Sequence, residues 1–351
     1  MVLRPINVQH TVTLCLAIAI CMMTRDAGAA TCKTQSQMTT AQRDELSTAA
    51  RAILGQVQSG DVQALRSNTI PAVAADFGGI ASSVDSLKPL VRQASITIDA
   101  LFALDATPDS LGAARTDFFC GSPLVVLNFT NLPPGSYALI IVHATGVPLP
   151  QQISLILSET APHHWMLAGF FNRPMLEAGH DGLWYWVRAR TYTQRSMNWN
   201  AWLYYRVAAY VLDPVDFLSS PNLEKLQHEE NRIRPEGLPG VKPVVLVAHG
   251  SSFQVTAIEP TAVFGTLDLE VHYTPDAAQA AQLRDASTAR MQVTEVMAAL
   301  LALHPELHDA FHGIWVRADG ASASLFSLEL PMDQIASGIE PMASGSHDVT
   351  P

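Results

Sequence analysis

The chain contains none of the short motifs that would identify a reaction. It has no glycine-rich phosphate-binding loop, no dinucleotide-binding fingerprint and no HExxH zinc signature. Basic residues are few, since 21 Lys and Arg stand against 32 Asp and Glu and the formal net charge is −11. Such an acidic chain is a poor partner for nucleic acid or anionic lipid surfaces. We therefore expect no cofactor, and a protein or small-molecule partner.

Cysteine is also scarce, with four residues in the 351. Two of them fall in a segment typical of a secretory signal, which combines Arg4, an apolar run at Thr11–Met23 and small residues around Ala27 and Ala29. The apolar run is shorter than the roughly 20 residues that span a bilayer. We expect residues 1–29 to be removed, which leaves an exported chain, periplasmic or extracellular, without a membrane span. An uncleaved anchor is the alternative.

Removal of that segment leaves two cysteines, Cys32 and Cys120. Two cysteines in an exported chain are most simply explained by a disulfide, and with only two the pairing is forced. The alternative is two separate thiols, because a sequence does not show the geometry that a disulfide needs.

Residues 30–174 show helix signals first and strand signals afterwards. Thr39 and Gln42 form a capping-box pattern ahead of a helix that runs to about residue 57, and Asp61 can cap a second, short helix. A third helix is expected near 80–90. Strands are expected at 94–104, 124–130, 137–144, 153–157 and 164–171, and the turn at 131–136 is expected to join two of them as a hairpin. This order predicts an α+β fold, with helices covering one face of a curved antiparallel sheet.

Three features of that segment carry a resemblance to a known family. They are the early helix followed by Ser59-Gly60-Asp61, the strand at Tyr137–Ala144, and the closing strand Trp165-Met-Leu-Ala-Gly169-Phe170. With these features the segment resembles the cone-shaped superfamily named after nuclear transport factor two. The resemblance implies a pocket between sheet and helices, in a superfamily of many binding or dimerisation modules and fewer enzymes. His143, in one of the strands, would reach that pocket if it points inward; a structural hydrogen bond with Asp99 is the alternative.

Large aromatic side chains are concentrated in one stretch of the chain. Five of the six tryptophans and five of the seven tyrosines lie between residues 165 and 210. Each ring can bury about 150–250 Å², so this stretch marks either the densest core or the main contact surface. The residues expected to form a contact surface are Trp165, Trp184, Trp186, Trp199, Trp202 and Tyr205.

Within residues 175–234, two helices are predicted at 183–194 and 198–212. The spacing of Tyr and Ala in them resembles a single tetratricopeptide helix pair, which implies a repeat-type module. Because one such repeat buries little core by itself, the alternative is a helical hairpin docked on the flanking domains. A further charged helix is expected at 222–231, exposed to solvent.

A Pro/Gly-rich linker at 234–240 precedes a second, smaller α+β domain at 241–335. Strands are expected at 244–248, 253–258, 267–273, 313–317 and 324–330, the last two joined around Asp319-Gly320, with one long helix at 277–304. Residues 336–351 are small and polar, and we expect them to be disordered. His249-Gly250-Ser251 follows an apolar strand but lacks the glycines of a nucleophile elbow, so we interpret it as a hairpin turn.

Two histidine groups are candidates for chemistry. His164, His180 and Asp181 lie near the domain junction, where a His–Asp pair could act as an oriented general base; a packed junction loop is the alternative. His304, His308 and His312 are spaced by four residues and would line one face of a continuous helix as zinc ligands. Pro305 argues against that helix, so capping or surface histidines are the alternative and no metal is expected.

The sequence does not identify a ligand or a reaction. The function that it favours is that of an exported binding or assembly protein, which would use the aromatic helical hairpin and the pocket of the first domain. The alternative is a secreted hydrolase with its site at the domain junction.

Overall fold

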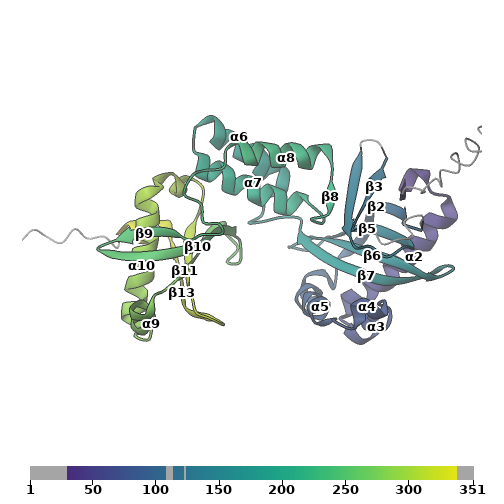
Figure 1. Cartoon of the computed structure of the whole chain (residues 1–351), viewed down its shortest axis with the longest axis horizontal. Coiled ribbons are helices and arrows are strands. Elements are labelled where there is room, and N and C mark those ends of the chain that lie inside the picture. Colours follow the sequence, from purple (N-terminus) through teal and green to yellow (C-terminus); the bar gives the residue numbers. More distant parts are fainter. Residues whose placement is uncertain (1–29, 108–113, 122–123, 338–351) are drawn as a thin grey trace, which may run out of the picture.

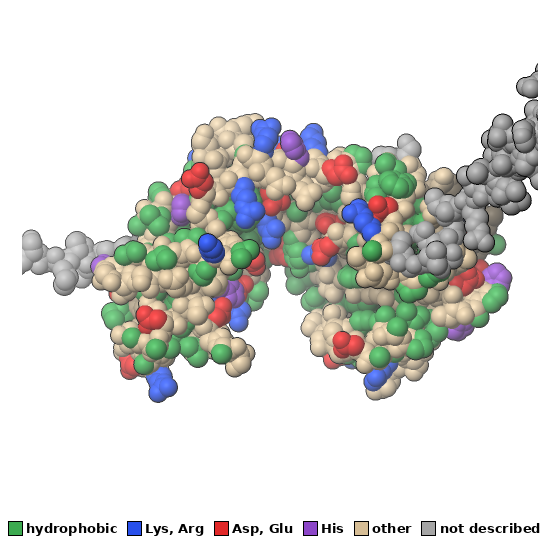
Figure 2. Space-filling model, viewed as in Figure 1, with side chains coloured by type: hydrophobic (Ala, Val, Ile, Leu, Met, Phe, Trp, Pro, Cys, Tyr) green, Lys and Arg blue, Asp and Glu red, His purple; other side chains and the backbone are tan. Residues whose placement is uncertain are grey.

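The computed structural model describes residues 30–107, 114–121 and 124–337 (Figure 1). The expected signal segment lies outside these ranges, as does the tail expected to be disordered at 336–351, except that residues 336 and 337 end a helix instead. The described chain is α+β, as predicted. Two lobes, each built on a five-stranded sheet, are connected by a helical segment (Figure 1). Figure 2 shows a deep hollow between the lobes, below that segment.

The N-terminal lobe begins with helices and continues with strands, as the sequence indicated. Its elements are β1 (Thr31–Thr34), η1 (Gln35–Gln37), α2 (Thr40–Ser59), α3 (Val62–Ser67), α4 (Pro71–Ala74), α5 (Gly78–Val91), β2 (Ser95–Asp105), β3 (Arg115–Cys120), β4 (Val125–Thr130), β5 (Ser136–Thr145), β6 (Gln151–Ala161) and β7 (His164–Pro174).

The first helices start where the capping signals predicted. Thr39 Oγ1 accepts a hydrogen bond from the Gln42 backbone N–H at 3.2 Å, and Gln42 Oε1 accepts one from the Thr39 backbone N–H at 3.1 Å. This reciprocal pair satisfies donors that the first turn of α2 leaves free. Gly60 ends α2 in the left-handed conformation, with φ of 70°, and Asp61 Oδ1 accepts from the Ala64 backbone N–H to start α3.

The large sheet of this lobe has the strand order β1-β2-β5-β6-β7, with every neighbouring pair antiparallel. Its central strand β5 is buried on both faces. Ala138, Ile140 and Val142 share a core with α2 and α5, while Leu139 and Ile141 pack on the opposite face. Burial on both faces explains why β5 reads as a continuous apolar run rather than an alternating one.

A smaller sheet of β3, β4 and β8 (Leu218–Ser219) covers the face of the large sheet opposite the helices. The predicted hairpin across residues 131–136 is therefore wrong: β4 pairs with β3 and β8, whereas β5 pairs with β2 and β6. The physical reason is that Phe118 and Leu127 are completely buried between the two sheets. The turn consequently carries the chain from one layer to the other.

Cys32 and Cys120 form the predicted disulfide, with their Cα atoms 5.2 Å apart. Cys32 lies on the edge strand β1 of the large sheet, and Cys120 ends β3 of the small sheet. The bond therefore fastens the two layers together at the edge of the lobe.

The connecting helical segment comprises α6 (Gly182–Gln194), α7 (Asn198–Leu212) and α8 (Pro221–Arg232). The two predicted helices agree with α6 and α7 to within one residue. Between α7 and α8 the chain returns to the N-terminal lobe, where β8 pairs with β4. The charged helix α8 is not wholly exposed, because Leu226 is buried against the core that α7 shares.

Glu229 of α8 fastens the three helices of this segment together. Its carboxylate accepts two hydrogen bonds from Arg190, at 2.7 and 2.8 Å, and one from Trp186 Nε1 at 2.8 Å. Tyr205 of α7 donates a further one at 3.2 Å. These donors, Arg190 first, lower the pKa of Glu229 to about 2.

The C-terminal lobe has a mixed sheet in the order β13-β12-β11-β10-β9, in which only β11 and β12 are parallel. A helical crossover joins those two strands, as parallel pairing requires. The elements of this lobe are β9 (Val244–Ala248), β10 (Ser251–Thr261), β11 (Asp268–Thr274), α9 (Ala277–Gln282), α10 (Ala286–Leu303), η2 (Pro305–Asp309), β12 (Gly313–Asp319), β13 (Ser324–Pro331) and α11 (Met332–Ser337).

One predicted helix of this lobe is divided in two in the structure. The helix expected at 277–304 is two helices, because Asp285 Oδ1 accepts from the Thr288 backbone N–H at 2.9 Å and starts α10 anew. His249 and Gly250 form a two-residue turn with φ of 47° and 85° between β9 and β10. The predicted turn is confirmed, and Ser251 belongs to a strand. The predicted pairing of β12 with β13 is also confirmed.

The aromatic helices share one hydrophobic core with the C-terminal lobe. Tyr192 and Tyr204 donate hydrogen bonds from their hydroxyls to the backbone carbonyls of Asp309 and Ala310, at 2.9 and 2.7 Å. The ring of Trp199 lies 4.1 Å from that of His304 between centroids. The main break in the hydrophobic core thus falls after β7 rather than at the linker 234–240. No helix in the described part of the chain is long and apolar enough to cross a membrane.

Removal of the disulfide by Cys32→Ala with Cys120→Ala is expected to lower the free energy of unfolding by about 4 kcal/mol. The bond closes a loop with a sequence separation of 88, and the reduced chain gains that loop's entropy when it unfolds. Urea denaturation of the oxidised protein and of the double variant measures the difference. Equal midpoints for the two would contradict a stabilising bond.

Glu229→Gln is expected to lower the free energy of unfolding by about 2 kcal/mol near pH 7. The folded-state pKa lies below the ordinary value of 4.5, so this contribution is present above that value and is lost as pH falls through about 2. Denaturation curves of variant and wild type should therefore converge in acid. Glu236→Gln, at an exposed carboxylate beyond α8, is the matched control and should leave stability unchanged.

Candidate functional site

One face of α7 is turned away from the hydrophobic core against which the helix packs. Trp202, Arg206 and Tyr210 follow each other at intervals of four residues, so their side chains lie along one stripe of the helix. The Arg206 guanidinium lies over the indole of Trp202, 5.6 Å from the ring centroid. Tyr210 keeps 44% of its surface exposed.

Three cavities adjoin this stripe, and Arg206 lines all of them. The first, of about 440 Å³, lies between α7 and the β10–β11 region of the C-terminal lobe. The second, of about 480 Å³, lies between α7, α8 and the N-terminal lobe, and Tyr210 also lines both of these. The third, of about 450 Å³, follows α8 toward Arg234. We call this set of cavities the α7 crevice.

The guanidinium of Arg206 is available to a ligand. It forms no ion pair with any carboxylate in the described ranges. Glu230 is near enough that the charge of Arg206 opposes, without reversing, the rise in the Glu230 pKa that burial causes. Arg173 is different: it forms an ion pair with Asp216 and lies over the ring of Tyr210, 4.9 Å from the centroid. Of the two arginines that line the second cavity, Arg173 is therefore paired with a carboxylate and Arg206 is not.

Carboxyl groups in the α7 crevice are held partly out of water. Burial raises the pKa of Asp213 to about 6, against the opposing effects of the Val215 backbone N–H and Arg173. Burial also raises the pKa of Glu177 and of Glu230. Such groups donate a hydrogen bond when protonated and accept one when ionised, which suits them to a polar ligand.

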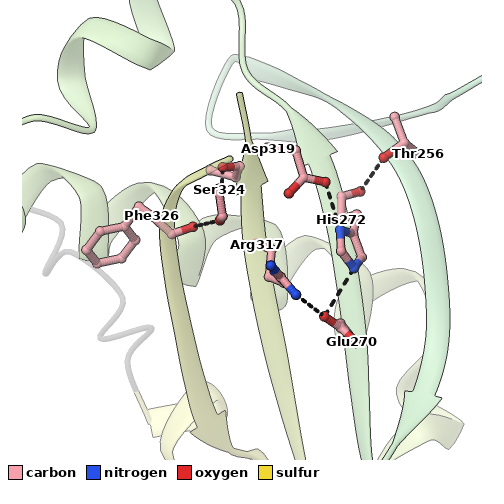
Figure 3. A network of polar contacts seen from close by, with 8 residues as sticks. Thr256, Glu270, His272, Arg317, Asp319, Ser324 and Phe326 are labelled. Carbon is pink, nitrogen blue, oxygen red and sulfur yellow. Dashed lines mark hydrogen bonds and ion pairs between the residues drawn. The ribbon is translucent and has the colours of Figure 1, made fainter. Parts of the chain in front are cut away.

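A second polar group lies on the face of the C-terminal sheet away from α10 (Figure 3). His272 Nδ1 lies 2.7 Å from Asp319 Oδ2, and its Nε2 lies 3.2 Å from Glu270 Oε1. Arg317 Nη1 donates to the same Glu270 oxygen at 3.0 Å. Both imidazole nitrogens are engaged, so neither is free to take a proton from a substrate. The group cross-links β11 and β12.

The structure separates the predicted contact rings into core and surface. Trp186, Trp199 and Tyr205 are buried, so they present no face to a partner, while Trp202 is half-buried in the α7 crevice. Trp184 is 39% exposed and stacks on His180, with ring centroids 3.7 Å apart.

Trp165 belongs to a different part of the molecule, the N-terminal lobe. Its Nε1 donates to Glu45 Oε1 at 2.6 Å, and it borders a cavity of about 280 Å³ beside α2 that Glu45 and His163 also line. His143 is not in a pocket between sheet and helices, because apolar side chains fill that space and His143 lies on the other face of β5. It contacts Gln152 at 3.1 Å and Asp99 at 3.8 Å instead.

His164, His180 and Asp181 do not form a common site. His164 is the first residue of β7, and His180 comes six residues after the strand has ended at Pro174; β7 alone spans about 30 Å at roughly 3.3 Å per residue. Asp181 Oδ1 accepts from the Trp184 backbone N–H at 2.8 Å and caps α6, so it orients a helix and not an imidazole. The predicted general base at the domain junction has no support in this geometry.

His304, His308 and His312 likewise do not line one helix. α10 ends at Leu303 and Pro305 starts the separate turn η2, as the proline indicated. His304 packs on Trp199, and burial lowers its pKa. His308 is exposed, and His312 contacts Asp268 instead of the other two histidines.

The residues of the α7 crevice that sequence reasoning missed are Arg206, Tyr210, Glu177, Arg173 and Asp213. For the first two a signal was present, since Trp202, Arg206 and Tyr210 follow a four-residue spacing along a predicted helix. The others come from β7 and from the ends of elements, so only the folded chain places them beside α7.

Asp213→Asn is expected to raise the free energy of unfolding by about 2 kcal/mol near pH 8 and to change it little near pH 4. The folded-state pKa of about 6 lies above the ordinary 3.8, so the favourable contribution of the protonated group is lost as pH rises through about 6. Denaturation across this range measures the effect, with Asp76→Asn as the exposed control. A variant no more stable than wild type in alkali would contradict the buried carboxyl.

Comparisons of the chain with protein-family models, with curated proteins and with solved structures found no match. The resemblances to the cone-shaped superfamily and to a tetratricopeptide helix pair therefore stay predictions. What the chain does is inferred from its own geometry.

Proposed function

We propose that this chain is an exported binding protein whose ligand occupies the α7 crevice. One observation carries the proposal: Arg206 has no carboxylate partner in the described ranges and lines three cavities at once. Ligand sites are found preferentially at domain interfaces, and volumes of 440–480 Å³ fall in their usual range. An exposed tyrosine and a half-buried tryptophan beside that arginine add contact area at a low entropy cost.

The lining of the first cavity favours a small zwitterionic ligand, such as an amino acid or a short peptide. Arg206 offers a fork of donors that suits a carboxylate. Glu177 and Glu259 offer acceptors for an ammonium group, and Val207, Val263 and Leu267 form an apolar wall. A polyanion is disfavoured, because acidic residues outnumber arginines around the crevice.

Binding accounts for this geometry better than hydrolysis does. The histidines that a hydrolase would need are dispersed, and His272 has both ring nitrogens occupied. Export is supported by the disulfide between Cys32 and Cys120, because such bonds persist in oxidising compartments. The acidic charge of −11 favours a partner other than nucleic acid.

Arg206→Gln is expected to weaken binding of the matching ligand at least tenfold, which corresponds to about 1.4 kcal/mol. Isothermal titration with free amino acids and with dipeptides is the measurement, after a thermal-shift screen for the best probe. The variant should fold normally, because Arg206 is exposed and forms no ion pair in the described ranges.

Arg232→Gln is the matched control, since this exposed arginine in the last turn of α8 lies outside the three cavities. It should bind the same probe as wild type does. A screen in which no amino acid or dipeptide shifts the melting temperature would refute the zwitterionic ligand. A neutral sugar that binds with equal strength to wild type and to Arg206→Gln would refute the role of Arg206.

A further inference from the structure

Three potential metal ligands from separate parts of the chain converge at one end of the C-terminal sheet. Asp268 is the first residue of β11, His312 directly precedes β12, and Glu329 lies near the end of β13. One ligand atom from each lies within 4.8 Å of those of the other two. Within the described ranges no other group of three or more His, Cys, Asp and Glu converges in this way.

The carboxylates of Asp268 and Glu329 are not balanced by lysine or arginine side chains in the described ranges. Asp268 is completely buried, at 0% exposure, and Glu329 is half-buried beside it. No lysine or arginine in the described ranges forms an ion pair with either carboxylate, and His312 is the only basic side chain in contact with Asp268. Buried carboxylates in proteins are paired with cations or coordinate metal ions, because an isolated buried charge is very costly.

Gly313 has no side chain, and this leaves room for the carboxylates of Asp268 and Glu329 beside it. A Cβ atom at this position would lie 2.5 Å from Glu329 Oε1, 2.7 Å from the Leu330 backbone oxygen and 3.1 Å from Asp268 Oδ1. The backbone of Gly313 does not have positive φ. The glycine is therefore required for space and not for its conformational freedom.

The spacing of His312 and Asp268 fits two ligands of one ion. His312 Nδ1 lies 3.2 Å from Asp268 Oδ1, and two ligands of a cation at about 2.1 Å lie roughly 3.0–3.4 Å apart. Thr266 holds the other oxygen of Asp268, to which its hydroxyl donates at 3.0 Å. Such support from a neighbouring side chain orients ligating carboxylates.

We propose that Asp268, His312 and Glu329 bind a divalent transition-metal ion, and that Zn²⁺ matches this donor set best. One imidazole nitrogen with two carboxylate oxygens suits zinc better than calcium or magnesium, which take oxygen ligands alone. The His312 side chain is 52% exposed, so the ion is reached from solvent and three protein ligands leave a position for water. The ion ties together the ends of β11, β12 and β13.

The test is zinc titration of the full chain, prepared without an affinity tag, stripped with EDTA and with its free thiols alkylated. We expect one Zn²⁺ per chain by calorimetry and by elemental analysis, together with a rise in the melting temperature of the C-terminal lobe. His312→Ala and Glu329→Gln should each weaken the affinity at least tenfold. Circular dichroism in EDTA checks that each variant is folded.

His308→Ala is the matched control, because His308 is an exposed histidine four residues away that takes no part in the group. It should bind zinc as wild type does. Three results would overturn the proposal: no binding by the stripped wild type at about 100 µM zinc, equal affinity in wild type and His312→Ala, or stronger binding of Ca²⁺ than of Zn²⁺.

Discussion

The packing of tyrosine and tryptophan rings between the helices α6 and α7 and the C-terminal lobe determines how the molecule is arranged. Tyr192 of α6 and Tyr204 of α7 each bury a ring and donate a hydrogen bond from the hydroxyl to a backbone carbonyl, that of Asp309 at the end of η2 and that of Ala310 directly after it. A buried hydroxyl needs such a partner. Each tyrosine therefore contributes buried apolar area through its ring and fixes its orientation through the hydrogen bond of its hydroxyl. Because the face of α7 that carries Tyr204 is fixed in this way, the opposite stripe with Arg206 and Tyr210 lines the cavities between α7 and the two lobes.

That orientation has an electrostatic consequence. The carboxyl groups that line the α7 crevice are partly removed from water, and burial raises the pKa of Asp213, Glu177 and Glu230. Keeping such groups at a domain junction costs stability near neutral pH. A protein that needed only to fasten its lobes together would be better served by apolar side chains there. A polar ligand that pairs with these groups offsets the cost, which is the physical basis of the proposed binding function.

The C-terminal sheet uses its two faces in different ways. Leu269, Val271 and Tyr273 of β11 are buried in the core with α10, while the alternate residues Glu270 and His272 point to the other face. The parallel register between β11 and β12 places Arg317 beside His272. At one end of that face Glu270 is thus paired with Arg317, and His272 lies between Glu270 and Asp319. At the other end Asp268 and Glu329 have only His312, and this imbalance is what the proposed ion corrects.

The sequence by itself determined the elements whose signals are local. The capping box at Thr39, the helices that became α6 and α7, the turn at His249-Gly250 and the α+β class all follow from spacing along the chain. With only two cysteines outside the expected signal segment, the disulfide pairing could also be predicted from the sequence. The prediction from local sequence was wrong where a capping side chain divides a predicted helix in two, as Asp285 does between α9 and α10.

Only the tertiary structure decided which aromatic rings are core, which strands share a sheet and where charged groups meet. A ring's burial depends on the surface that reaches it, so Trp199 is buried and Trp184 is not, although both precede buried helical positions. The partner of His312 lies 44 residues earlier in the chain, and that of Arg173 43 residues later. Contacts of this range arise from the packing of whole sheets and helices, and no periodicity in the local sequence records them.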